Sequence, residues 1–191
     1  MMIALLRKAI ILRFWSILMS LDGYIARTDG AVDWLGGEDP KDPGNSYETF
    51  LKGIDTVLMG ANTYRQITQD LSPDCWPYAG LSCYVFTHKT LPSPQPPDCQ
   101  PVATTPAALL AILKQRPGWD IWLCGGAHLI RQFQRADLID RYWITLIPTV
   151  LGEGIPLFPA DGRECPLHLE GTHIYNGMVD LIYTRRNTLQ R

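Results

Sequence analysis

The most constraining feature of the sequence is an apolar run that ends in two adjacent glycines. Residues 121–124 are apolar, Gly125 and Gly126 follow, and large apolar side chains then recur at helical spacing over residues 129–133. Residues without Cβ allow a sharp turn and the close approach of another group. The helix that follows offers free N–H groups and the positive end of its dipole, which suit a phosphate. The pattern predicts a nucleotide-binding turn made by Gly125, Gly126, Ala127 and Leu129, and a tight turn without a ligand is the alternative.

A second unit of strand, glycine and helix start lies earlier in the chain. Residues 56–59 are rich in β-forming side chains, Gly60 follows, and Asn62 or Thr63 is expected to cap the next helix. The exposed N–H groups of such a helix start also suit a phosphate. Because parallel strands end at one edge of a sheet, we expect Gly60, Ala61, Asn62 and Thr63 to meet the glycine pair there.

A third strand end carries polar groups of a different kind. The apolar residues 81–86 are followed by the hydroxyl, imidazole and ammonium groups of Thr87, His88 and Lys89. This combination suits a phosphate monoester, such as the 2′-phosphate that distinguishes NADP from NAD. A solvated loop is the alternative.

Length and charge limit the classes of protein to consider. The chain has 191 residues and is expected to form one domain over residues 10–185, with an extension at residues 1–9 and a tail at residues 186–191. The formal net charge of −2, without a basic run, argues against nucleic acid as a partner. Five cysteines without a Cys-x-x-Cys pair suggest neither a disulfide framework nor a metal site, and free thiols are typical of the cytoplasm.

Short strands alternate with helices along the chain. Threonine and proline at residues 105 and 106 are expected to start a helix, whereas the proline-rich residues 91–101 are expected to be irregular. The alternation favours an α/β fold with a mostly parallel sheet, to which a C-terminal hairpin adds an antiparallel edge. The other expected elements are a strand at 10–19, a helix at 45–52, a strand at 141–150 and the hairpin strands 167–174 and 178–184.

Several motifs follow one another in an order that resembles a known family. They are Ser20-Leu21-Asp22-Gly23-Tyr24-Ile25-Ala26, Met59-Gly60-Ala61-Asn62-Thr63-Tyr64, Phe86-Thr87-His88-Lys89, Cys124-Gly125-Gly126 and the stretch from Ile147 to Phe158. The set resembles the dihydrofolate reductase-like superfamily, and more closely its branch related to the C-terminal reductase domain of bacterial riboflavin biosynthesis. The resemblance covers nearly the whole chain.

The resemblance implies a reductase that uses NADPH. The implied fold is an eight-stranded, mostly parallel mixed sheet flanked by helices, with an antiparallel C-terminal hairpin. In this family the two glycine turns hold the pyrophosphate, and the strand end that matches Thr87, His88 and Lys89 takes the 2′-phosphate. The segments that match Leu18, Ile25 and Ala26 line the nicotinamide.

The substrate side is predicted from one helix and one aromatic residue. In dihydrofolate reductase itself a carboxylate on the first helix grips the pteridine, and the acid of the corresponding helix here is Glu48, which also fits a capping box. Tyr47 and Leu51 share the apolar face of this helix. Trp34 is expected either to wall the nicotinamide pocket or to lie in the core. The helical offset of Glu48 does not match the family's carboxylate position, and the family's Pro-Trp pair is Asp33-Trp34 here. These departures from the family pattern argue against folate as the natural substrate.

Two carboxylates in the first glycine-flanked segment are candidates for catalysis. Asp22 and Asp33 are expected to border the nicotinamide, where a buried carboxylate with a raised pKa acts as an acid near neutral pH. The Asp-Gly pair at Asp22 also fits a simple turn. Hydride transfer itself needs little from the protein beyond orientation and the exclusion of water.

The sequence thus favours an NADPH-dependent reductase of a small pterin- or pyrimidine-like heterocycle or a carbonyl compound. One alternative is the riboflavin-pathway 5-amino-6-(5-phosphoribosylamino)uracil reductase, and another is a nucleotide-binding protein without catalytic activity. A homodimer is also expected, because alternation within an apolar run exposes half of its side chains on a second face. A central strand buried on both faces is the alternative for this run, which comprises Tyr142, Trp143, Ile144, Leu146, Ile147, Ile155, Leu157 and Phe158.

Overall fold

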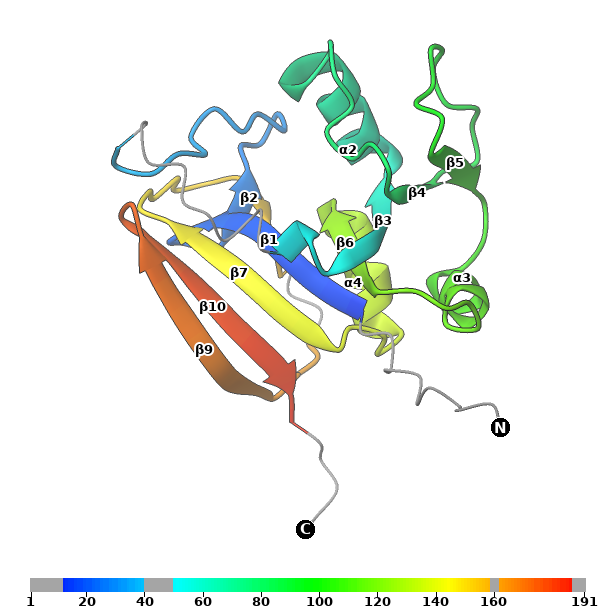
Figure 1. Ribbon diagram of the computed structural model, residues 1–191. Helices are drawn as coiled ribbons and strands as arrows, with labels where there is room; N and C mark the ends of the chain where they lie inside the picture. The colour runs from blue at the N-terminus through cyan, green and yellow to red at the C-terminus, as the bar shows by residue number, and fades with distance from the viewer. Residues whose placement is uncertain (1–11, 40–49, 159–161, 187–191) are drawn as a thin grey trace.

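A computed structural model describes residues 12–39, 50–158 and 162–186. Its centre is an eight-stranded sheet in the order β5-β4-β3-β6-β1-β7-β10-β9, which crosses the whole molecule in Figure 1. A short second sheet pairs β2 (Tyr24–Ala26) with β8 (Ile155–Pro156). The strands of the large sheet are β1 (Leu12–Ser20), β3 (Ile54–Gly60), β4 (Ser82–Phe86), β5 (Cys99–Val102), β6 (Asp120–Gly125), β7 (Arg141–Ile147), β9 (Leu167–Tyr175) and β10 (Met178–Arg185).

The direction of the strands decides where a ligand can bind. β5, β4, β3, β6, β1 and β7 run parallel to one another, whereas β10 and β9 form the antiparallel hairpin at the C-terminal end. The carboxyl ends of the parallel strands therefore meet at one edge, which is where open α/β sheets bind ligands. The α/β class, the mostly parallel sheet and the hairpin agree with the expectation from the sequence.

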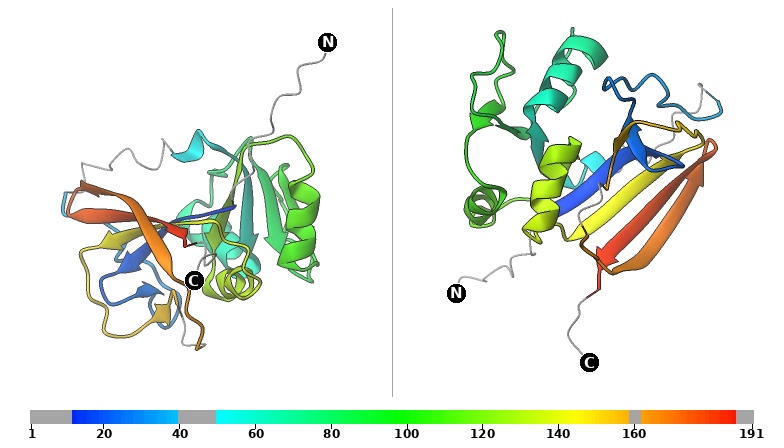
Figure 2. Two further views of the ribbon diagram at one scale, coloured as in Figure 1. Left: turned by 90° about the horizontal axis from the view of Figure 1, so that it is seen from below. Right: turned by 180° about the vertical axis from the view of Figure 1, so that it is seen from behind.

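Helices lie on both sides of the parallel part of the sheet (Figure 2), and apolar side chains pack against both of its faces. Ile121 and Leu123 of β6 pack against α3 and α4. Trp122 points to the opposite face, because side chains alternate along a strand, and it packs with Phe50 and with Tyr64 of α2. The described helices are α2 (Ala61–Gln66), the π-helix η1 (Ile67–Leu71), α3 (Pro106–Leu113) and α4 (Ala127–Arg135).

One helix starts as the sequence predicts, and another does not. Thr105 caps α3 through its side chain, and Pro106 occupies the first turn, as expected. α2 begins directly at the end of β3, with Gly60 at its N-cap and no side-chain cap. The expectation that Asn62 or Thr63 caps this helix is therefore wrong, since both residues already lie inside it.

Other helices and strands also begin or end at residues that differ from the predicted ones. The proline-rich segment 91–101 is not wholly irregular, because Cys99 pairs with Cys83 at the start of β5. β7 ends at Ile147, directly before Pro148, which has no N–H to continue the ladder. The helix expected over residues 45–52 lies mostly outside the described residues, within which Phe50 and Leu51 are helical.

The apolar run of β7 is buried in the sheet. β7 lies between β1 and β10, and Tyr142, Ile144 and Ile147 are all buried. Trp143, on the opposite face, stacks on the ring of His173. The expectation that half of this run is exposed is therefore wrong, and the central-strand alternative holds for it. Phe158 beyond the strand is 45% exposed.

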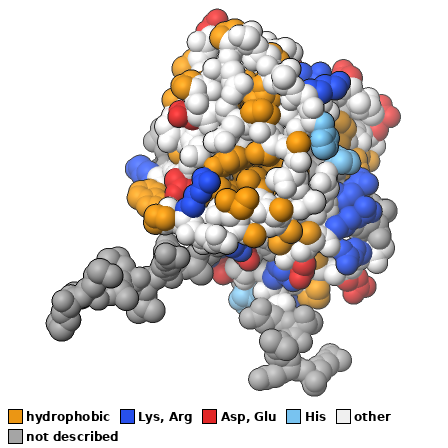
Figure 3. All heavy atoms as spheres, turned by 90° about the vertical axis from the view of Figure 1, so that its right-hand side faces the viewer, with side chains coloured by type: hydrophobic (Ala, Val, Ile, Leu, Met, Phe, Trp, Pro, Cys, Tyr) orange, Lys and Arg blue, Asp and Glu red, His pale blue; other side chains and the backbone are white. Residues whose placement is uncertain are grey.

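Some apolar side chains do reach the surface. Figure 3 shows such side chains among polar ones on the side of the molecule that carries β5 and α3. Ile112 of α3 is 50% exposed and Trp119, just before β6, is 61% exposed. Within residues 12–39, 50–158 and 162–186, no helix has the length and apolar character needed to span a lipid bilayer.

Candidate active site

The two glycine turns meet at the carboxyl edge of the sheet. β3 and β6 are parallel neighbours, and Met59 pairs with Gly125 in their ladder. A Cβ atom on Gly60 would lie 3.9 Å from the carbonyl oxygen of Gly125 and from the amide nitrogen of Gly126. The gap between the turns stays open because neither turn carries a side chain there. The predicted convergence of Gly60 with the glycine pair is confirmed, and the Gly125-Gly126 peptide bond is cis.

A cleft with a volume of about 1710 Å³ opens at these turns. It extends past the ends of β6 and β1 to the turn between β9 and β10. Thr87, His88 and Lys89 lie outside its wall, although Phe86, the residue before them, belongs to it. Most residues predicted to hold the cofactor do line the cleft, namely Leu18, Ile25, Ala26, Gly60, Ala61, Asn62, Thr63, Gly125, Gly126, Ala127 and Leu129.

Two arginines line the glycine end of the cleft, and sequence reasoning missed both. Arg65 of α2 donates a hydrogen bond to Asn62. The Nε atom of Arg131 on α4 is buried and has no hydrogen-bond partner within the described residues. Arg131 lies one helical turn after Ala127, so helical spacing from the glycine pair provided a usable signal. Guanidinium groups bind phosphate oxygens well, and both arginines belong to the cleft wall.

Two groups of apolar and aromatic side chains line the cleft, one beside the glycine turns and one at the β9–β10 turn. The rings of Tyr78 and Trp122 pack edge to face with centroids 5.2 Å apart. The Tyr78 hydroxyl lies 3.7 Å from the sulfur of Cys124. Burial raises the pKa of the Cys124 thiol to about 12, so this thiol stays protonated near neutral pH and is a poor nucleophile. The first group consists of Ile67, Tyr78, Trp122 and Cys124, and the second group, the apolar end of the cleft, consists of Leu18, Leu35, Ile147, Tyr175 and Met178.

Neither of the predicted substrate residues that the structure describes lines the cleft. Trp34 is buried against Ile147 and Met178 and is not part of the cleft wall, which supports its core alternative. Leu51 packs against the core on the Phe50 side of the sheet and also lies outside the wall. Tyr47 and Glu48 lie outside the described residues. No three His, Cys, Asp or Glu side chains gather as a metal site in the part of the chain that the structure describes.

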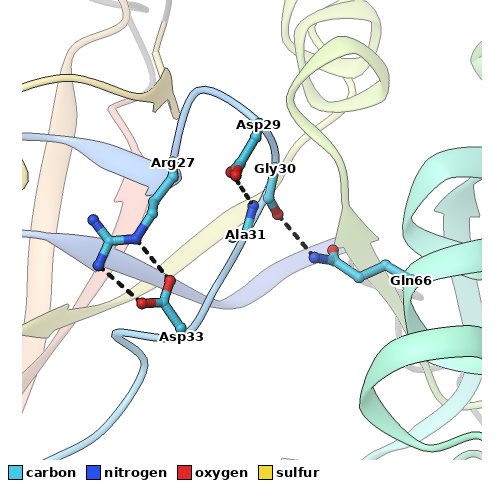
Figure 4. A network of polar contacts seen from close by, with 6 residues as sticks. All are labelled: Arg27, Asp29, Gly30, Ala31, Asp33 and Gln66. Atoms are coloured by element: carbon cyan, nitrogen blue, oxygen red, sulfur yellow. Dashed lines mark hydrogen bonds and ion pairs between the residues drawn. The ribbon is translucent and has the colours of Figure 1, made fainter.

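The loop that follows β2 is held by a network of polar contacts (Figure 4), and its residues 28–32 line the cleft. Arg27 pairs with Asp33 at 2.7 Å, and Asp29 accepts a hydrogen bond of 2.9 Å from the backbone N–H of Ala31. The loop is tied to α2, because the Gln66 amide donates a hydrogen bond of 2.9 Å to the carbonyl of Gly30. Residues 27–33, called the strap below, thus connect the β2 side of the cleft to the α2 side.

A second loop is attached to the hairpin turn. The side chain of Asn176 accepts a hydrogen bond of 2.6 Å from the backbone N–H of Asp39 and donates one of 2.8 Å to the Asp39 carbonyl. Gly36, Gly37 and Asp39 line the cleft beside Asn176. These contacts place the β9–β10 turn at the apolar end of the cleft.

The two candidate catalytic carboxylates do not have the expected properties. Asp22 is exposed, and hydrogen bonds from the Ser20 hydroxyl and from the N–H groups of Gly152 and Leu151 lower the pKa of its carboxyl. Asp33 is also exposed, and its hydrogen-bonded ion pair with Arg27 lowers its pKa. Neither residue lines the cleft. The expectation of a buried acid with a raised pKa is therefore wrong for both residues, and the turn alternative for Asp22 holds.

The sequence relationship agrees with this geometry. Residues 14–183 match the RibD C-terminal domain family. The chain belongs to this family. Among its relatives, the uncharacterized protein YwjB of Bacillus subtilis strain 168 is 41% identical over 169 residues, which are 88% of this chain and 95% of YwjB.

Solved structures show the same fold. A Shewanella sp. PV-4 protein assigned to riboflavin biosynthesis is 27% identical with a TM-score of 0.79, and the match covers 94% of this chain and 100% of that chain. Dihydrofolate reductase from Enterococcus faecalis, solved in complex with NADP(H), is 14% identical with a TM-score of 0.63, over 94% and 98% of the two chains. This RibD C-terminal domain therefore has the fold of dihydrofolate reductase.

Proposed function

We propose that this protein is an NADPH-dependent reductase that transfers a hydride to a small pterin- or pyrimidine-like heterocycle or to a carbonyl compound. The main support for this function is that Gly60 meets Gly125 and Gly126 at one end of a cleft whose other end is apolar and aromatic. A dinucleotide needs an open cradle at its pyrophosphate, and an apolar wall suits a planar ring. Membership of the RibD C-terminal domain family favours a pyrimidine among these substrates.

The residues present fit the cofactor. The glycine turns, the start of α4 and the partnerless Nε of Arg131 would hold the pyrophosphate. Leu18, Ile25 and Ala26, on β1 and β2 beyond the glycine turns, would contact the nicotinamide. When bound, NADPH supplies the hydride, and the work of the chain is to orient the two rings and to keep water away from them.

The 2′-phosphate is assigned to the strand end at β4. Thr87, His88 and Lys89 follow Phe86, which lines the cleft, and the Thr87 hydroxyl accepts a hydrogen bond from the backbone N–H of Lys89. A group of this kind binds a phosphate monoester through charge-assisted hydrogen bonds. This assignment is the reason for proposing NADPH rather than NADH.

Filling the cradle tests the proposal. Gly60 has φ −84°, and a Cβ there meets nothing closer than 3.9 Å, so Gly60→Ala is expected to fold with an unchanged melting temperature. Its methyl group would occupy the space of the pyrophosphate, and we expect NADPH affinity to fall about tenfold or more, equivalent to about 1.4 kcal/mol. Fluorescence titration with NADPH measures the effect. Gly171→Ala in β9, where a Cβ meets nothing within 4 Å, is the matched control.

The outcomes separate the three functions considered. Failure of the unsubstituted protein to bind NADPH would contradict the proposal. NADPH binding without oxidation across pterins, aminopyrimidines and carbonyl compounds would favour a nucleotide-binding protein without activity. Selective turnover of the phosphoribosylaminopyrimidine would identify the riboflavin-pathway reaction.

A further inference from the structure

A fully buried carboxylate lies in the sheet beside the apolar end of the cleft. Asp180 of β10 has no exposed surface. Its Oδ1 atom accepts hydrogen bonds from the Thr145 hydroxyl at 2.6 Å and from the Tyr175 hydroxyl at 3.2 Å. Its Oδ2 atom is buried and has no hydrogen-bond partner within the described residues. Burial of a carboxylate costs free energy because it removes the group from water, so its presence here calls for an explanation.

No cation of the described residues forms an ion pair with Asp180. His173 is its direct cross-strand partner in the β9–β10 ladder, but the His173 ring is exposed and stacks on Trp143 with centroids 5.9 Å apart. Among the described residues, the side chain of Asp180 is therefore held by two hydroxyl groups. Both donate to the same oxygen atom, which fixes how these hydroxyls point.

The neighbours of Asp180 on its face of the sheet line the cleft. Thr145 is its partner on β7, and Leu18 is the partner of Thr145 on β1. Met178 lies two residues from Asp180 on the same face. Leu18, Met178 and Tyr175 all belong to the cleft wall. Tyr175 thus connects the buried carboxylate to the cleft through a single hydrogen bond.

This end of the cleft is separated from the cofactor cradle. β10 lies three strands beyond β6 in the sheet order, which corresponds to about 14 Å at the usual strand spacing. The nicotinamide is assigned to the ends of β1 and β2, between the two. Tyr175 therefore lies on the substrate side of the cleft, if the cofactor is bound as proposed above.

The direction of the hydrogen bonds gives Tyr175 a defined polarity. The Tyr175 hydroxyl donates its hydrogen bond to the Oδ1 atom of Asp180, so its proton is directed to this carboxyl group. Any further hydrogen bond to the phenol oxygen must then be one that this oxygen accepts. The contact with a carboxylate also polarises the hydroxyl and strengthens that acceptor.

We infer that Tyr175, oriented by Asp180, is a substrate-binding residue that selects a heterocycle carrying an N–H donor, such as an amino-substituted pyrimidine. Asp180 and Thr145 act as positioning residues behind it. This inference rests on the proposed reductase function for the placement of the substrate, and it extends that function to the chemical class of the ring. It also gives a role to a buried carboxyl group that pairs with no cation of the described residues.

Two pyrimidines that differ in hydrogen-bond donors test the inference. The probes are 2,4-diaminopyrimidine and 2,4-dimethoxypyrimidine, which has acceptors but no N–H group, titrated by calorimetry into protein saturated with NADP⁺. The unsubstituted protein is expected to prefer the diamino compound. Tyr175→Phe is expected to weaken binding of the diamino compound about tenfold, as expected for one good hydrogen bond, and to leave the dimethoxy compound unchanged.

Asp180→Asn provides a second variant with a sharper outcome. An amide can donate to the Tyr175 oxygen, which frees the phenol proton to point into the cleft. The preference for the diamino compound is then expected to decrease and binding of the dimethoxy compound to improve. Tyr183→Phe removes a phenol hydroxyl from β10, the strand of Asp180, at a position outside the cleft wall. It is the matched control for Tyr175→Phe and is expected to keep the preference for the diamino compound.

The possible results separate the inference from the proposed function. Equal affinity of the two probes for the unsubstituted protein, no binding of the diamino compound, or an unchanged preference in Tyr175→Phe would each overturn the role of Tyr175. Failure to bind NADP⁺ or NADPH would overturn the proposed function instead. In that case the same titration of the cofactor-free protein still decides whether Tyr175 selects N–H donors.

Discussion

At the scale of single residues, two cationic side chains at or near the cleft are expected to bind different parts of the cofactor. Arg131 belongs to the wall beside the glycine turns, and its Nε has no partner within the described residues. Lys89 follows the end of β4, just beyond Phe86. NADPH and NADH share the pyrophosphate and differ only in the 2′-phosphate. Removal of each cation should therefore change the affinities for the two cofactors differently.

The first prediction uses this difference. Arg131→Ala is expected to weaken NADPH and NADH equally, whereas Lys89→Ala is expected to weaken NADPH alone. Loss of one charge-assisted contact costs about 1.5–3 kcal/mol, which is a factor of roughly ten to one hundred in affinity. Titration of both cofactors into both variants measures it. Equal affinity of the unsubstituted protein for NADPH and NADH would refute the assignment of the 2′-phosphate to Thr87, His88 and Lys89.

A second prediction concerns Asp22, which is a structural residue at the end of β1. Its carboxylate binds the Ser20 hydroxyl at 2.6 Å and the backbone N–H of Gly152 at 2.7 Å, and so joins β1 to the segment after β7. These contacts lower its pKa below the usual value of 3.8. A carboxylate with a lowered folded-state pKa stabilises the fold above its unfolded-state pKa, and this contribution is lost as the pH falls through the folded-state value.

Asp22→Asn is therefore expected to lower the melting temperature at pH 7, and the difference from the unsubstituted protein should narrow as the pH falls below about 4. Thermal unfolding followed by circular dichroism at pH 7 and pH 3 measures both values. Asp74→Asn is the control, because exposed Asp74 makes no hydrogen bond or ion pair within the described residues. A difference that is the same at both pH values would show that the charge of Asp22 does not stabilise this turn.

At the scale of elements, the strap and α2 enclose the cleft between them. The strap lines the cleft with Thr28, Asp29, Gly30 and Ala31, and the hydrogen bond from Gln66 to Gly30 joins it to α2. Gln66 stands at the end of α2, where the helix continues as the π-helix η1. Short π-helical turns occur often at functional sites because they redirect side chains. This junction aims the Gln66 amide at the strap.

Gln66→Ala is the third prediction. The lost hydrogen bond is worth about 0.5–1.5 kcal/mol, so we expect the dissociation rate of NADPH to rise between two- and tenfold with little change in melting temperature. Stopped-flow fluorescence measures the rate. Gln115→Ala, an exposed glutamine after α3, is expected to change nothing. An unaltered dissociation rate in Gln66→Ala would show that the strap does not retain the cofactor.

At the scale of the whole molecule, the sequence predicted what depends on local pattern. The glycine turns, the Thr105-Pro106 helix start and the Asn176-Gly177 hairpin each have a local physical cause, and all three occur as expected. The tertiary neighbours of a side chain have no such local pattern. Asp33 pairs with Arg27 within the strap, and Asp180 accepts a hydrogen bond from Thr145 on the neighbouring strand β7. The sequence alone could therefore not distinguish the exposed acid from the buried one.

The last prediction concerns assembly. The expected homodimer can no longer use the apolar run of β7, which is buried, but β9 is an edge strand of the sheet and bears exposed Leu169 and Ile174, at 47% and 79%. A long edge strand with apolar side chains is a natural surface for pairing with a second copy. Light scattering is expected to give twice the chain mass of 21.5 kDa for the unsubstituted protein and for Ile112→Asp on α3, and the monomer mass for Ile174→Asp. A monomer of the unsubstituted protein at micromolar concentration would refute the dimer, and a dimer of Ile174→Asp would move its interface away from β9.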